Sequence, residues 1–154
     1  MKKLFITLYI LANLDCYSQK VFYFKEFPKD SIEAIEKNFI SAIDSRKEIV
    51  SAFPEGAEEV LQHWTDLHVT FQHYLKDHKF FFETDTKFFL RFYFNKDGTI
   101  ARVGYNLKES MEKETRLKFD DQLTSFSSTH NFGMKAQQPY VQCGTVIYKK
   151  NDNQ

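Results

Sequence analysis

The stretch FYFNKDGTIARVGYN, residues 92–106, places two apolar runs on either side of an Asn-Lys-Asp-Gly sequence. The run that leads into it, KFFLRFYF, is rich in aromatic residues that favour strands, and the returning TIARVGYNL has apolar residues at alternate positions. Gly98 is free to adopt the positive φ that a tight turn demands. The pattern predicts an antiparallel hairpin over residues 88–107, in which Phe92 and Phe94 pair through the turn with apolar residues of the second strand.

Two amphipathic helices are predicted before this hairpin, after a short extended segment, KVFYFKEF. Apolar residues recur at helical spacing between Ile32 and Val50, with charged residues on the other side, which predicts a first helix over residues 31–52. FPEG ends this helix, and a second helix is predicted over residues 57–77. The buried stripe of the second helix consists of Val60, Trp64, Leu67, Phe71 and either Tyr74 or Leu75.

The segment after the hairpin, KESMEKETRLKFDDQLTSFSS, fits two patterns. Leu117 and Phe119 alternate as in a strand, whereas Phe119, Leu123 and Phe126 are spaced as in a helix, and we favour a helix over residues 113–125. PYVQCGTVIYKK then predicts a final strand over residues 141–149. The expected fold is α+β, with two N-terminal amphipathic helices packed on a small antiparallel sheet built in the order hairpin, helix, final strand.

The N-terminus, MKKLFITLYILANLDCYSQK, has the features of a secretory signal peptide. Its apolar run is shorter than the roughly 20 residues that span a bilayer, and Cys16 and Ser18 stand at the −3 and −1 positions of a cleavage site before Gln19. We therefore expect a cleaved signal peptide over residues 1–18, one domain over residues 19–150 and a disordered tail over residues 151–154. The expected location is the periplasm or the extracellular space, with no stable membrane span after cleavage.

Two other interpretations of this N-terminus are open. One is a retained amphipathic or anchoring helix. The other is lipid attachment at Cys16, which Asp15 disfavours because lipoprotein processing requires a small residue just before the cysteine. After cleavage Cys143 is the cysteine that remains in the sequence, so an intrachain disulfide is excluded.

The charge balance excludes one class of partner. The whole chain has a formal net charge of 0, and loss of residues 1–18 removes two lysines and one aspartate, which leaves −1. Basic residues are scattered along the chain rather than concentrated. Because phosphate binding depends on concentrated Lys and Arg, we expect no nucleic-acid partner.

Four histidines in HWTDLHVTFQHYLKDH are five residues apart, at positions 63, 68, 73 and 78. Metal ligands on one helix face must be three or four residues apart, whereas a five-residue step turns the side chain by about 140° around the axis. We therefore expect no metal site and no cofactor in this helix.

The sequence also gives little support for a catalytic site. His63 and Asp66 are neighbours on the predicted helix, but neither Ser127 nor Ser128 stands in a Gly-x-Ser-x-Gly turn. Cys143 lies within a predicted strand and is expected to be a buried, inert thiol. The sequence favours a protein that is not an enzyme.

The hairpin and final strand resemble the C-terminal domain of the TonB energy-transducer family. The resemblance covers residues 87–149, where FYFNKDGTIARVGY is similar to that family's strand, Asp-Gly turn and strand, and YVQCGTVIY stands where its closing strand stands. The family's Tyr-Pro before its first helix, its Pro-rich spacer and its uncleaved anchor are missing. The resemblance therefore implies a free-standing secreted relative of the fold, with a small antiparallel sheet backed by helices.

Two binding functions are consistent with the sequence. The first is a protein–protein interaction module of the cell envelope, whose sheet edge accepts an envelope protein or an extended peptide segment. Candidate contact residues are Phe89, Arg91, Tyr93, Tyr105 and Tyr140. The alternative is a carrier of a hydrophobic small molecule in a cavity lined by the aromatic residues of KFFFETDTKFFLRFYF. Aromatic residues make up 17% of the chain, and these rings also suffice to fill a core.

Overall fold

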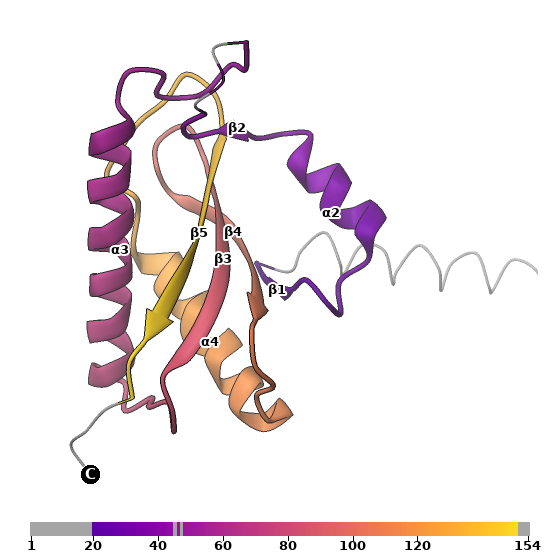
Figure 1. Ribbon diagram of the computed structural model, residues 1–154, viewed down its shortest axis with the longest axis vertical. Coiled ribbons are helices and arrows are strands. Elements are labelled where there is room, and N and C mark those ends of the chain that lie inside the picture. The colour runs from indigo at the N-terminus through magenta and orange to yellow at the C-terminus, as the bar shows by residue number, and fades with distance from the viewer. Residues whose placement is uncertain (1–19, 45, 47, 151–154) are drawn as a thin grey trace, which may run out of the picture.

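The predicted hairpin lies in the middle of the sheet in the computed structural model (Figure 1). Its two strands are β3 (Thr86–Phe94) and β4 (Ile100–Leu107). They pair antiparallel, with Phe92 opposite Val103 and Phe94 opposite Ile100. In the turn, Gly98 has a φ of +85°. The hairpin, its pairing and the conformation of its glycine are thus confirmed.

The structure describes residues 20–44, 46 and 48–150. The predicted signal peptide, residues 1–18, and the predicted disordered tail, residues 151–154, lie outside this range. The described residues form three helices and five strands, which confirms the α+β class. None of these three helices has the length and apolar character that crossing a membrane requires.

The sheet is larger than predicted and is mixed rather than antiparallel. Its strand order is β1-β4-β3-β5-β2. The three further strands are β1 (Val21–Tyr23), β2 (Ile40–Ser41) and β5 (Tyr140–Tyr148). β5 runs antiparallel to β3 and pairs with all nine of its residues, which confirms the predicted final strand. At the two edges, β1 runs parallel to β4 and β2 runs parallel to β5.

Two long helices cover one face of this sheet (Figure 1). They are α3 (Ala57–Asp77), which has the predicted bounds, and α4 (Lys113–Thr129), which confirms a helix in the ambiguous segment. The rings of Phe71 in α3 and Phe126 in α4 are 4.7 Å apart, and Phe119 of α4 stacks on Phe88 of β3 at 4.7 Å. We call this face of the sheet the inner face.

The first predicted helix is wrong in its length. α2 (Lys29–Glu36) ends after eight residues, and the chain then extends to form β2 beside β5. The backbone N–H groups of Ile40 and Ala42 donate to two carbonyls at the start of β5, at 3.1 and 2.8 Å. This pairing with a strand that is distant in sequence overrides the local helical spacing. That spacing continues to Val50, whose side chain is 69% exposed.

α2 lies on the opposite face of the sheet, which we call the outer face. Ile35 of α2 forms a second, smaller core with Phe22, Phe27 and Tyr93. Phe22 stacks on Phe27 with ring centroids 4.5 Å apart. Because successive side chains of a strand alternate between faces, Tyr93 faces this core while its neighbour Phe92 is buried against α3. Both sets of aromatic rings are therefore used in packing.

The packing of the inner-face core leads to a first prediction, which concerns stability. Phe92 is fully buried and meets the Trp64 and His68 rings of α3 edge-on, at 5.7 and 5.8 Å. Phe92→Ala should lower the free energy of unfolding by about 3 to 5 kcal/mol, because it removes a buried ring and leaves a cavity. The control is Ile147→Ala on neighbouring β5, where the side chain is 51% exposed and the loss should be about 1 kcal/mol or less. Equal losses in urea melts of the two variants would contradict this packing.

The conformation of the hairpin turn leads to a second prediction, which concerns the melting temperature. A Cβ atom added at Gly98 would lie 2.5 Å from the carbonyl oxygen of Met134, and the positive φ of Gly98 disfavours a β-branched residue. Gly98→Val should therefore lower the melting temperature, because it strains the turn and displaces the Met134 carbonyl that accepts a hydrogen bond from Tyr140. Lys96→Val, at an exposed position of the same turn, is the control and should change it little. A wild-type melting temperature for Gly98→Val would show that the turn is not under this constraint.

Candidate binding edge of the sheet

β5 is fully paired on one side and mostly unpaired on the other. It pairs with β3 through all nine of its residues, but with β2 only at Tyr140 and Val141. Among the described residues, no strand continues beside residues 142–148, and we call this part of β5 the open edge. A strand with unpaired N–H and C=O groups is a template for pairing with another chain.

The direction of the backbone groups along the open edge follows from the pairing with β2. The carbonyls of Pro139 and Val141 accept hydrogen bonds from that side. In a regular strand every second residue directs its N–H and C=O to the same side, and β5 has no register shift along β3. Cys143, Thr145 and Ile147 therefore present their backbone groups to the open edge. The carbonyl of Cys143 also accepts a hydrogen bond from the side-chain amide of Gln142, at 3.3 Å.

The same three residues place their side chains on the outer face, where they are exposed. Ile147 is 51% exposed, and Cys143 and Thr145 are also exposed. The prediction of a buried Cys143 is therefore wrong, because the second core covers Val141 but does not reach Cys143. No residue between Tyr140 and Tyr148 is charged. Edge strands of monomeric proteins often carry lysine, which opposes pairing, and this one does not.

α3 runs along β5 on the inner face (Figure 1). Its Trp64 lies directly over Gly144, since a Cβ atom added there would come within 2.9 Å of the indole Nε1. One turn further on, Nδ1 of His68 and the hydroxyl of Tyr148 are hydrogen-bonded at 2.8 Å. These contacts fix β5 against α3 while its open edge stays exposed.

A cavity of about 260 Å³ lies where β5 and α3 end, and we call it the terminal pocket. Its apolar lining is formed by Leu75, Phe80, Phe81, Phe82 and Tyr148. Its polar lining is formed by Gln72, His73, Lys76 and Lys149. Phe81 is 37% exposed, so the pocket combines apolar surface that is open to solvent with two lysine residues.

The five predicted contact residues do not form one surface. Phe89 and Arg91 lie half-buried on the outer face, where Arg91 forms an ion pair with Glu36 of α2. Tyr93, Tyr105 and Tyr140 are fully buried in the two cores. The sequence could not separate these groups, since aromatic residues of a strand serve packing and recognition alike.

The three buried tyrosines differ in their hydrogen bonds. Tyr105 donates to Asp120 at 2.6 Å and Tyr140 donates to the carbonyl of Met134 at 2.9 Å, whereas the Tyr93 hydroxyl has no partner among the described residues. Burial raises the pKa of Tyr93 to about 12 and raises the pKa of Tyr105 and of Tyr140 as well. All three hydroxyls therefore stay protonated at neutral pH.

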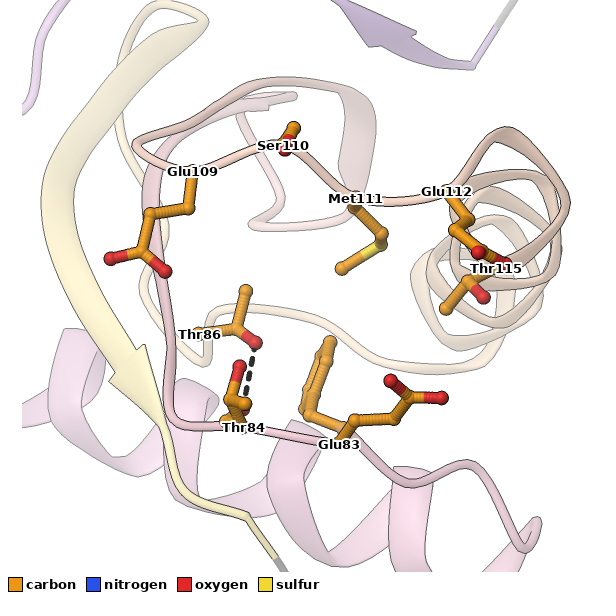
Figure 2. Close-up of a pocket in the computed structure, with 9 residues that line it drawn as sticks. Glu83, Thr84, Thr86, Glu109, Ser110, Met111, Glu112 and Thr115 are labelled. Carbon is orange, nitrogen blue, oxygen red and sulfur yellow. Dashed lines mark hydrogen bonds between the residues drawn. The ribbon is translucent and has the colours of Figure 1, made fainter.

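A second cavity, of about 150 Å³, opens at the far end of the hairpin (Figure 2). Met111 points into it, with Glu109 on one side and Glu83 and Glu112 on the other. The Glu109 carboxylate lies on the opposite side of the cavity from those of Glu83 and Glu112 (Figure 2). No cluster of three or more His, Cys, Asp or Glu side chains in the described part of the chain is placed to hold a metal ion.

The residues considered for hydrolysis have separate partners. Asp66 accepts a hydrogen bond from Gln62 at 2.9 Å, and the Ser127 and Ser128 hydroxyls donate to carbonyls of their own helix. His63 packs against Phe132. Within residues 20–44, 46 and 48–150, no hydrogen bond joins the imidazole, the carboxylate and a serine hydroxyl.

Comparison with known proteins adds no family to this description. No model of a known protein family matches the chain, and neither a curated protein nor a solved structure matches it. The resemblance of residues 87–149 to the TonB C-terminal domain therefore stays a prediction.

The burial of His68 leads to a third prediction, which concerns how stability depends on pH. Burial lowers its pKa to about 4, and its Nε2 has no hydrogen-bond partner among the described residues. In the unfolded chain His68 protonates near its ordinary pKa of about 6.5, so the unfolded state binds more protons between these values. Stability should therefore fall as the pH drops from about 6.5 to about 4, by about 3 kcal/mol from this group.

Denaturant melts across this pH range test the assignment to His68. His68→Gln should flatten the dependence of the unfolding free energy on pH, whatever its effect on overall stability. Thr70→Gln, at an exposed position of the same helix, changes no titratable group and is the control, so it should leave the dependence unchanged. Identical slopes for wild type and His68→Gln would rule out His68 as the titrating group.

Proposed function

We propose that this protein is a non-enzymatic binding module that accepts an extended segment of a partner protein as an added strand on the open edge of β5. The observation that carries the proposal is that β5 pairs with β3 along its full length but with β2 only at its first two residues. The added segment would occupy the position that β2 leaves. Its main chain would supply affinity and its alternate side chains specificity.

The physical requirements for strand addition are present at this edge. Cys143, Thr145 and Ile147 offer three N–H donors and three C=O acceptors in one row, and pairing with β3 already holds the strand in place. Because β5 is already ordered, it loses little conformational entropy on binding. Most of the conformational entropy that binding removes is therefore lost by the partner segment. The exposed side chains of the same residues would contact every second side chain of the partner on the outer face.

The partner would be an envelope or secreted protein. This part of the proposal rests on the signal peptide predicted at residues 1–18, and it agrees with the free-standing secreted module that the TonB resemblance implies. The hydrophobic-carrier alternative has less support, because most of the rings that would line its cavity pack on one another. Phe88 and Phe92 are fully buried, and Phe82 lies 5.6 Å from Phe88.

Hydrogen exchange and proline substitution test the open edge. In the free protein the amides of Thr145 and Ile147 should exchange rapidly, whereas those of Gly144 and Val146, which face β3, should be protected. Thr145→Pro should leave the fold intact because it removes an N–H that faces solvent. Val146→Pro is the matched control, and it should lower stability by at least about 1 to 3 kcal/mol because it removes a hydrogen bond to β3.

Binding is tested with peptides selected from a randomised display library. Peptides that bind as proposed should protect the Thr145 and Ile147 amides from exchange and should lose their affinity for Thr145→Pro. Peptides that bind Thr145→Pro as tightly as wild type, or that leave both amides unprotected, would show that the open edge of β5 is not the binding site.

A further inference from the structure

We infer that the open edge of β5 takes the C-terminal end of its partner, which runs parallel to β5 and places its last side chain and its carboxylate in the terminal pocket. The inference rests on the proposed function and specifies the partner class. It combines the position of β2, the distribution of charge along α3 and the lining of the terminal pocket.

The position of β2 limits the length of a bound segment. β2 already occupies the place beside Tyr140 and Val141, and it runs parallel to β5. A segment beside residues 142–148 therefore has β2 at one end and the terminal pocket at the other. Because paired strands match residue for residue, this length holds roughly seven residues of an extended chain.

Charge favours the direction in which the carboxylate reaches the pocket. The start of β5 lies near the beginning of α3, since the rings of Phe53 and Tyr140 are 5.1 Å apart. That end of α3 is acidic, with Glu55, Glu58 and Glu59 around one open cavity. At the other end, Lys76 and Lys149 are among the residues that line the terminal pocket. A terminal carboxylate is repelled at the first end and attracted at the second.

The two lysines of the pocket differ in their availability. Lys149 forms an ion pair with Asp85, with Nζ and Oδ2 2.7 Å apart. Lys76 is exposed, and it takes part in no ion pair with the described acidic residues. Lys76 is therefore the group that is free to pair with an incoming carboxylate.

The pocket offers an apolar surface and a cation close together, and a C-terminal residue satisfies both at once. Its side chain would lie on the Phe80 and Phe81 rings while its own main-chain carboxylate meets Lys76. An internal Asp or Glu fits less well, because the side chain next to it in an extended segment points to the opposite face. The fitting ligand is thus a segment that ends in a free carboxylate on an apolar residue.

The test uses a library of randomised heptapeptides displayed with free C-termini. Selected peptides should end in an apolar residue, and each is then synthesised as the free acid and as the C-terminal amide. The acid should bind at least about tenfold tighter than the amide, which lacks the charge that pairs with Lys76. Lys76→Glu should remove this difference by weakening the acid alone.

Two variants serve as controls. Lys96→Glu makes the same charge change in the hairpin turn, at the other end of β3, and should alter the binding of neither peptide. Phe81→Ala removes a partly exposed ring from the pocket and should reduce the preference for an apolar last residue. Both variants keep the open edge of β5 intact.

The outcomes separate this inference from the proposed function. Equal affinities for acid and amide, both lost in Thr145→Pro, would overturn the C-terminal inference and leave strand addition standing. Selected peptides that bind Thr145→Pro normally would overturn the proposed function as well. A library that yields no binder would overturn both.

Discussion

The pairing of β3 on both of its sides is the constraint on which the rest of the structure depends. β4 and β5 are both hydrogen-bonded to it along most of its length, and its rings Phe88, Phe92 and Phe94 are buried in the inner-face core. A large aromatic side chain buries roughly 150 to 250 Å², so a few such rings can anchor a small domain. The same arrangement holds β5 rigidly by one edge and leaves the other edge free, which is what a preformed binding edge requires.

Local signals predict the parts of this fold that are formed by neighbouring residues. The hairpin follows from two apolar runs around Gly98, and α3 follows from a stripe at 3.6-residue spacing that ends at Leu75. The length of α2 and the parallel edge strands could not be predicted in this way. Ile40 extends because it meets a carbonyl at the start of β5, and no pattern in the N-terminal segment records that distant contact.

The sequence likewise predicts only some features of the candidate binding edge. Alternation in the final strand predicts that Cys143, Thr145 and Ile147 share a face, but it cannot tell which face is covered. That depends on where the second core ends, and for this reason Cys143 was expected to be buried. The open edge itself follows from the strand order and from the shortness of β2, neither of which has a local signature. Tyr105 and Tyr140 were candidate contacts because of their residue type, and their burial excludes them from the surface proposed here.

A crystal structure of the protein with a selected peptide tests most directly whether a partner adds to the open edge of β5 as a strand. If the partner binds by strand addition, an added strand should lie about 4.8 Å from β5, the spacing of neighbouring strands in a sheet. That strand should be hydrogen-bonded to the backbones of Cys143, Thr145 and Ile147 and should continue the position of β2. A peptide that binds in the second cavity (Figure 2) or along the edge of β1, and leaves residues 142–148 unpaired, would show that the open edge of β5 is not the binding site.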